Sequence, residues 1–203
     1  MKYIFCVLGV LGVLLTHAQT KTYEQTILEH RESYKKAFLE EENSPLKKSD
    51  FKYLDFYPVN SSYLVTAQFK RIEDTIGFDM KTHSGKLKPY VVYGVVEFEL
   101  KGQRCSLYIY QSVTLRTQKG LEDLLFIPFT DVSSGTETYG GGRYLDFSIN
   151  DIFSNKLIID FNKAYNPYCA YKGGYSCPIP PKENFLNLTV EAGEKRFKNE
   201  PKD

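Results

Sequence analysis

A run of alternating residues from 90 to 100 constrains the fold more than any other part of the sequence. One face of this run carries the apolar residues Tyr90, Val92, Val96, Phe98 and Leu100. The opposite face carries Val91, Tyr93, Glu97 and Glu99. A period of two is typical of a β-strand with one buried face. Residues 103–111 alternate again after Lys101-Gly102, where glycine can take the positive φ of a two-residue turn, so the sequence predicts an antiparallel hairpin.

Further segments with strand-like patterns surround this hairpin. They cover residues 62–71, 75–82, 124–129, 143–149, 156–161 and 185–191. Proline cannot donate a hydrogen bond to a neighbouring strand, so Pro128 should place its segment at a sheet edge or at a strand end. Short strands joined by turns predict a mainly β fold, with a single antiparallel domain that is barrel-like or a sandwich.

One N-terminal amphipathic α-helix is expected over residues 23–42. Thr22 and Gln25 have the spacing of a capping box, in which each side chain bonds the backbone of the other. Apolar residues then recur at helical spacing: Tyr23, Ile27, Tyr34 and Phe38. The helix should end before Pro45, because a residue that precedes proline is pushed out of the helical region.

The first 18 residues have the pattern of a secretory signal peptide. Lys2 precedes an apolar run over residues 4–15, and Thr16-His17-Ala18 offers small residues for cleavage before Gln19. The run is shorter than the roughly 20 residues that cross a bilayer. We therefore predict a signal peptide of residues 1–18 and one β-rich domain of residues 19–203, secreted or periplasmic and without stable membrane insertion.

The charge balance argues against a nucleic-acid partner. The chain has 26 Lys and Arg residues against 25 Asp and Glu, and loss of Lys2 with the signal leaves 25 of each sign. Affinity for nucleic acid comes mainly from neutralising phosphates, which needs a basic excess.

Three cysteines follow the signal: Cys105, Cys169 and Cys177. Cys105 alternates with apolar neighbours and should be a small buried residue, whereas Cys169 and Cys177 are the natural disulfide pair in an oxidising compartment. Two alternatives are a zinc site and a catalytic thiol. Only His30 and His83 could complete a metal site or supply a base, so we predict no metal and no cofactor.

Arg143 is the most unusual residue of the chain. Strand alternation places it on the apolar face with Leu145, Phe147 and Ile149, where a guanidinium needs an anionic partner. Gly140, Gly141 and Gly142 precede it and could present free backbone N–H groups to a bound anion. The structural alternative is an ion pair with a carboxylate of the fold, for which Asp160, Glu191 and Glu194 are the candidates.

Several blocks of the C-terminal half carry a resemblance to one family. They are Pro128-Phe129-Thr130-Asp131, Glu137-Thr138-Tyr139, Gly142-Arg143-Tyr144-Leu145, the run from Asp160 to Tyr171, Cys177-Pro178-Ile179-Pro180-Pro181, Glu183-Asn184 and Glu191-Ala192-Gly193-Glu194. This signature region, residues 128–195, resembles the bacterial and archaeal family of domains of unknown function numbered 1684 (DUF1684). The likeness extends more weakly through the helix, residues 44–46 and residues 82–85. The resemblance implies no catalytic residues, because the family has no assigned function.

The sequence supports three functional hypotheses. The first is a binding module for a small anionic or polar ligand, held by Gly140, Gly141, Gly142, Arg143, Asn162, Tyr165, Asn166 and Tyr168 at the mouth of the barrel. The second is a hydrolase that uses a carboxylate pair, for which Asp146 and Asp160 are the first choices. The third is a structural or interaction protein of the cell envelope, whose signature specifies only its fold.

Overall fold

The computed structural model describes residues 21–73 and 76–199, so the predicted signal peptide lies outside the described residues. The strands are β1 (Leu64–Arg71), β2 (Phe78–Lys81), β3 (Leu87–Leu100), β4 (Gln103–Ser112), β5 (Leu124–Asp131), β6 (Arg143–Ser148), β7 (Lys156–Asp160) and β8 (Phe185–Leu186). The α-helix is α1 (Tyr23–Glu40). Short 3-10 helices are η1 (Lys48–Tyr53), η2 (Ser61–Tyr63), η3 (Leu115–Thr117), η4 (Ile149–Asp151), η5 (Phe161–Lys163), η6 (Tyr168–Ala170) and η7 (Lys182–Asn184).

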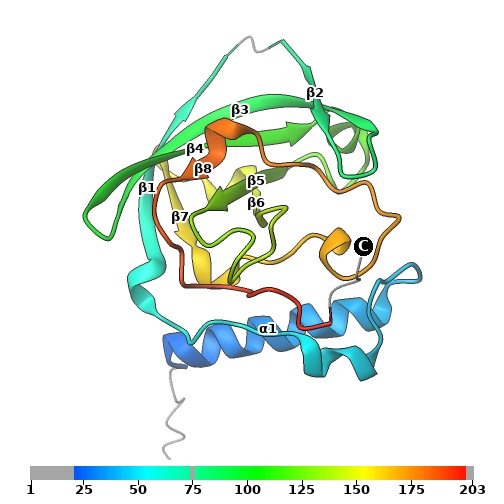
Figure 1. Cartoon of the computed structure of the whole chain (residues 1–203). Coiled ribbons are helices and arrows are strands. Elements are labelled where there is room, and N and C mark those ends of the chain that lie inside the picture. The colour runs from blue at the N-terminus through cyan, green and yellow to red at the C-terminus, as the bar shows by residue number, and fades with distance from the viewer. Residues whose placement is uncertain (1–20, 74–75, 200–203) are drawn as a thin grey trace, which may run out of the picture.

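The strands form one curled sheet in the order β6-β5-β4-β3-β1-β7. Neighbours along this path are antiparallel, while β2 adds to β3 and the short β8 runs parallel to β5. The sheet curls into a half-barrel around the main core, and α1 lies along one side of it (Figure 1). The predicted mainly β fold with one N-terminal helix is confirmed. In the described part of the chain, no helix is long and apolar enough to cross a membrane.

The predicted hairpin is present as β3 and β4. Lys101 and Gly102 both have positive φ, 50° and 76°, which matches the right-handed twist of the flanking strands. The predicted faces of β3, however, are only half correct. Val96, Phe98 and Leu100 lie in the main core, whereas Tyr90 and Val92 belong to a second apolar cluster with Met80 and Tyr110.

An irregularity between Val92 and Gly94 explains this difference. The pairing register with β4 shifts there, and one extra residue in a strand moves all residues beyond it to the other face. The sheet therefore carries apolar side chains on both faces of β3, and the second cluster extends through Phe126 toward β6.

The expectation that Pro128 marks a sheet edge is wrong, because β5 lies between β4 and β6. The ladder between β4 and β5 has a single register pair, Tyr110 with Phe126. Beyond it, the Asn184 side chain donates to the Pro128 and Tyr108 carbonyls at 2.8 and 2.9 Å and accepts from the Tyr108 N–H at 2.8 Å. A side-chain amide thus bridges the strands where proline has no N–H to offer.

Helix α1 begins as predicted. Thr22 and Gln25 form the complete capping box. Ile27 and Phe38 are its buried residues, and Phe38 packs in a third cluster with Leu46, Ala170, Tyr171 and Phe197. The far end of the predicted strand 185–191 is irregular. Only Phe185–Leu186 forms a strand, and the Val190 carbonyl accepts from the Arg143 guanidinium, so it is not available to a neighbouring strand.

Candidate functional site

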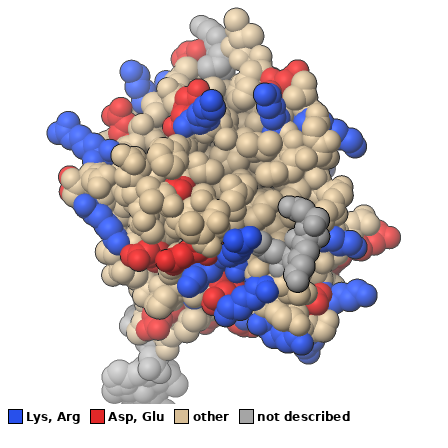
Figure 2. Space-filling model, viewed as in Figure 1, with Lys and Arg blue, Asp and Glu red and all other residues tan. Residues whose placement is uncertain are grey.

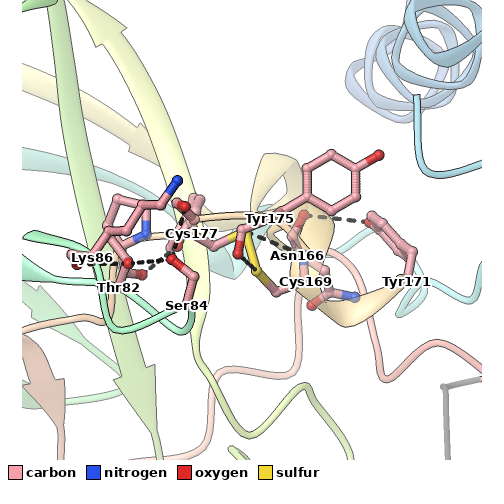
Figure 3. The surroundings of a disulfide bond; sticks show 11 residues. Thr82, Ser84, Lys86, Asn166, Cys169, Tyr171, Tyr175 and Cys177 are labelled. Atoms are coloured by element: carbon pink, nitrogen blue, oxygen red, sulfur yellow. Dashed lines mark hydrogen bonds between the residues drawn. A yellow bond between two sulfur atoms is a disulfide. The ribbon is translucent and has the colours of Figure 1, made fainter. Parts of the chain in front are cut away.

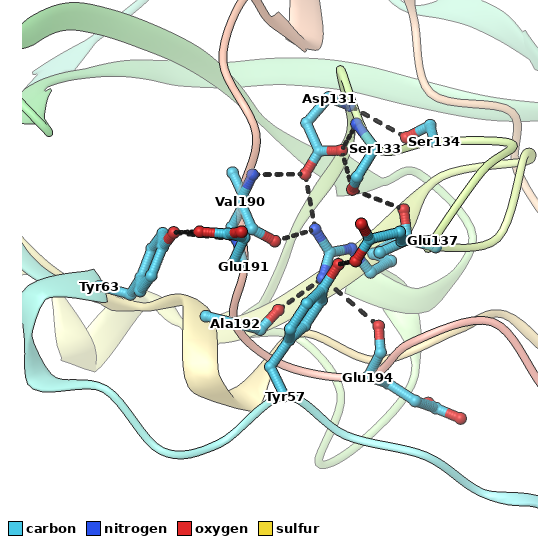
Figure 4. Close-up of polar contacts among 12 residues, drawn as sticks. Tyr57, Tyr63, Asp131, Ser133, Ser134, Glu137, Val190, Glu191, Ala192 and Glu194 are labelled. Carbon is cyan, nitrogen blue, oxygen red and sulfur yellow. Dashed lines mark hydrogen bonds and ion pairs between the residues drawn. The ribbon is translucent and has the colours of Figure 1, made fainter.

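Arg143 is buried in a closed ion pair with Asp131. Figure 4 shows Asp131, Val190, Ala192 and Glu194 around the guanidinium at the centre of these contacts. Only 1% of Arg143 is exposed. Its Nη2 donates to Asp131 Oδ2 at 2.6 Å and to the Val190 carbonyl at 2.9 Å, and its Nη1 donates to the Ala192 and Glu194 carbonyls. The inward orientation follows the predicted alternation, but the carboxylate partner is none of the three predicted acids.

The register of the sheet explains this choice of partner. Arg143 faces Phe129 across the β5–β6 ladder, so Asp131, which ends β5 two residues later, lies within reach. Asp131 Oδ1 accepts from the backbone N–H and the hydroxyl of Ser133. Asp131 Oδ2, which accepts from Arg143, also accepts from the Val190 N–H at 3.2 Å. The donors that motivated an anionic ligand at Arg143 are thus used inside the fold.

The glycines before Arg143 form a tight, packed turn. Gly142 has a φ of 84°, and a Cβ there would lie 2.6 Å from the Phe129 carbonyl oxygen. A Cβ on Gly141 would lie 2.6 Å from His83 Nε2. Close packing of Gly142 against β5, and of Gly141 against the His83 side chain, therefore explains these glycines without a bound anion.

The two asparagines predicted to bind a ligand make hydrogen bonds within the fold instead. Asn162 exchanges two hydrogen bonds of 2.9 Å with the backbone of Asn60 and donates to Tyr23 Oη at 2.9 Å. Asn166 donates its N–H to Glu194 Oε2 at 2.9 Å and its side-chain amide to the Lys195 carbonyl at 2.8 Å. Both asparagines are buried, and they join segments that are distant in the sequence.

A cleft of about 860 Å³ opens on the other side of β6. We call it the β6–β7 cleft, because residues of these two strands, which end the sheet at opposite edges, line it together with α1 and residues 163–178. Five tyrosines contribute to its wall: Tyr34, Tyr144, Tyr165, Tyr168 and Tyr175. Its charged and titratable lining residues are His30, Lys88, Asp146, Asp151, Asp160 and Lys163.

Four of the predicted site residues meet in this cleft, namely Tyr165, Tyr168, Asp146 and Asp160. Alternation along β6 gives the reason for Asp146, since a strand that turns Arg143 inward turns Tyr144 and Asp146 outward. Asp146 Oδ2 accepts from the Tyr165 hydroxyl at 2.6 Å. Its side chain is open to the cleft, yet burial by the surrounding walls raises the pKa of this carboxyl, while the Tyr165 hydrogen bond lowers it.

Asp160 has a different environment. Its Oδ1 accepts from the Tyr23 hydroxyl at 2.9 Å and from the backbone and side chain of Asn162 at 3.0 Å. It therefore caps η5 and holds the start of α1 against β7. The structure brings Asp146 and Asp160 to one cleft, but their participation in catalysis stays a prediction.

Cys169 and Cys177 form a disulfide with a Cα–Cα distance of 6.2 Å (Figure 3), and Cys105 is free. Cys177 belongs to the cleft wall, together with Tyr168 and Tyr175. His83 N–H donates to the Cys177 carbonyl at 3.0 Å, which joins this wall to the turn after β2. In the disulfide form Cys169 has no thiol to act as a nucleophile.

We expect the disulfide to be quantitative in the protein without residues 1–18. In urea, one thiol per chain should react before reduction and three after it, because only Cys105 is free. The Cys105→Ser chain is the control and should give none before reduction and two after. Reduction should lower the free energy of unfolding by roughly 2–3 kcal/mol, since the closed loop is short. Three reactive thiols before reduction would contradict the pairing.

Sequence reasoning missed most of the helical wall, and it predicted the wrong partner for one buried acid, Glu194. Tyr34 and Phe38 reach the cleft from α1, and no local pattern indicates which face of a helix meets a distant loop. Glu194 is fully buried and accepts hydrogen bonds from the Tyr34 and Tyr171 hydroxyls at 3.1 and 2.8 Å.

The family is decided by a match over residues 49–195 to the family described as "Protein of unknown function (DUF1684)". The chain belongs to the DUF1684 family. The matched region contains β1 to β8, the Arg143–Asp131 ion pair and most of the cleft wall, but not α1.

A solved structure supports the same fold. The solution NMR structure of an uncharacterized protein of Haloarcula marismortui is similar to this DUF1684 chain with 29% sequence identity and a TM-score of 0.65. The similarity covers 84% of this chain and 93% of that protein. No curated protein matched the chain.

Proposed function

We propose that this DUF1684 protein binds a small polar organic molecule in the β6–β7 cleft. The observation that carries the proposal is the cleft itself, whose volume of about 860 Å³ lies in the range of small-molecule sites. Such sites combine mainly apolar and aromatic walls with a few polar groups, as the tyrosines, Asp146 and Lys163 do here. The proposed site lies on the opposite side of β6 from the Arg143 guanidinium that first suggested a ligand.

The walls of the cleft are held in place by contacts that do not involve a ligand. Asp160 and Asn162 bind Tyr23 at the start of α1. At the other end of the helix, the Tyr168 hydroxyl donates to Glu41 and the Tyr175 hydroxyl donates to the Asn43 carbonyl. A site that is ordered before binding loses less conformational entropy when the ligand enters.

We also infer that the protein works outside the cytoplasm, in the periplasm or as a secreted protein. The pattern of residues 1–18 and the Cys169–Cys177 disulfide both support export. On the face seen in Figure 2, basic and acidic side chains are intermixed around a largely uncharged centre. This distribution favours a small ligand over a polyanionic partner such as nucleic acid.

The binding proposal can be tested with two tryptophan substitutions on α1. Ala37 lines the cleft, whereas Leu39 points away from it and is 51% exposed. Compounds found by an NMR screen of small polar molecules should bind the Ala37→Trp protein roughly tenfold more weakly, because the indole occupies their space. Leu39→Trp should leave binding unchanged. The proposal fails if no compound shifts resonances of the cleft, or if both variants lose affinity equally.

A second candidate is a hydrolase, because Asp146 and Asp160 line the same cleft and burial raises the pKa of Asp146. A raised pKa suits a carboxyl that donates a proton at neutral pH. Compounds that bind in the screen would then be converted, and new resonances would appear with time.

A further inference from the structure

We propose that the ligand of the β6–β7 cleft is an organic amine whose ammonium group binds between the Asp146 carboxylate and the rings of Tyr144 and Tyr165. This inference rests on the proposed function and names the chemical class of the ligand. It is carried by an unpaired carboxylate that is open to the cleft, by the arrangement of the tyrosines around it, and by the structural roles of the other two acids in the same cleft.

Asp146 is a carboxylate without a cation. Its one hydrogen bond among the described residues comes from the Tyr165 hydroxyl and reaches Oδ2. No lysine, arginine or histidine within residues 21–73 and 76–199 lies at ion-pair distance from it. Oδ1 accepts no hydrogen bond from the described residues, and Asp146 is an exposed residue of the cleft lining, so this oxygen is available to a ligand.

The tyrosines beside Asp146 form an aromatic corner. The ring centroids of Tyr144 and Tyr165 are 5.8 Å apart and their planes meet at 88°. The Tyr34 ring follows at 5.9 Å from Tyr165. The faces of tyrosine rings attract cations, and aromatic cages are a recurrent means of recognising ammonium groups.

The other two acids of the cleft make hydrogen bonds within the fold, and Asp160 is only 7% exposed. Asp160 Oδ1 accepts three hydrogen bonds from Tyr23 and Asn162, and Asp151 Oδ2 accepts the Ser148 N–H at 2.7 Å as a cap of η4. The cations of the cleft, Lys88 and Lys163, lie on other elements, namely β3 and η5. They would attract electron-rich groups of the ligand that are distant from its ammonium group.

Burial gives a further reason for a cation at Asp146. The walls of the cleft disfavour the ionised carboxylate and raise its pKa, and a positive charge at contact distance would offset that penalty. A neutral ligand of the same shape would not offset that penalty.

Two pairs of probes separate charge from shape. Choline is compared with 3,3-dimethylbutan-1-ol, and n-butylammonium with butan-1-ol, by NMR titration of the purified protein at low ionic strength. We expect the cations to bind in the cleft and to bind roughly tenfold more tightly than their neutral counterparts, equivalent to about 1.4 kcal/mol. We expect them to shift the resonances of Tyr144, Asp146 and Tyr165.

Asp146→Asn is the decisive variant, since asparagine keeps an oxygen for the Tyr165 hydroxyl but removes the charge. It should weaken the binding of the cations roughly tenfold and leave the binding of the neutral probes unchanged. Asp79→Asn makes the same change of charge on β2, outside the cleft, and should alter affinity by less than about twofold.

The outcomes distinguish this inference from the function on which it rests. Equal binding of charged and neutral probes in the cleft, or equal losses in Asp146→Asn and Asp79→Asn, would overturn the ammonium site and leave a small-molecule cleft in place. If neither these probes nor any compound of the wider screen shifts cleft resonances, both proposals are wrong.

Discussion

The Asp131→Asn protein is expected to be less stable than the wild type by about 3–5 kcal/mol. Removal of one partner from a buried ion pair leaves the other charge without compensation, and Arg143 and Asp131 are almost completely buried, with side chains 1% and 0% exposed. Asparagine also has a single acceptor oxygen in its side chain. It therefore cannot accept both the hydrogen bonds that Arg143 and Val190 donate to one oxygen of Asp131 and the bond that Ser133 donates to the other. Urea unfolding followed by circular dichroism measures the difference.

Glu32→Gln is the matched control for this prediction. It removes one carboxylate charge from the Lys35–Glu32 pair, in which Glu32 is 72% exposed, and pairs of this kind contribute about 0–1 kcal/mol. If Asp131→Asn costs no more than Glu32→Gln, the Arg143 pair is not a main support of the fold. The large loss is expected because Arg143 also donates to carbonyls of Val190, Ala192 and Glu194, and so holds the C-terminal segment against β6.

The second large effect is a loss of stability as the pH rises from about 4.5 to about 7. Burial raises the pKa of Glu194 from its ordinary 4.5 to about 7, against the opposing hydrogen bonds from Asn166, Tyr171 and Tyr34. The folded protein therefore holds a proton that the unfolded chain has released. The stabilisation is complete below pH 4.5 and is lost as the pH rises through 7, and its size is roughly 3 kcal/mol.

Glu194→Gln isolates this contribution. Glutamine resembles the protonated acid, so the variant should match the wild type at pH 4.5 and exceed its unfolding free energy by roughly 2–3 kcal/mol at pH 8. Burial lowers the pKa of His30 and His83, which makes stability increase with pH. Burial also raises the pKa of Asp146, which makes stability decrease with pH. These groups are present in both proteins and cancel in the difference. A difference that does not change with pH would contradict the assignment to Glu194.

Much of the fold could be predicted from the sequence, because the features concerned are local. The capping box of α1 involves Thr22 and Gln25 alone, and the hairpin follows from alternation around Lys101-Gly102. The inward turn of Arg143 follows from the period of its own strand. The irregularity after Val92 and the interior position of Pro128 could not be predicted, since both depend on what a neighbouring strand or the Asn184 side chain offers.

The site shows the same division. The sequence drew attention to Tyr165, Tyr168, Asp146 and Asp160, which the fold brings to one cleft. It also drew attention to Asn162, Asn166 and Arg143, which the fold uses for its own hydrogen bonds. Residue type alone does not distinguish these cases, because the same amide or guanidinium can meet a ligand or a backbone carbonyl.

The sequence by itself determined the helix start, most of the strands and the side of β6 to which each residue points, because each of these depends on neighbours a few positions away. Only the tertiary structure decided that Asp131 pairs with Arg143 and that a cleft opens between β6 and β7. Those outcomes depend on the strand register and on the curl of the whole sheet. The curl brings its two edge strands to one opening, where Tyr144 and Asp146 face α1.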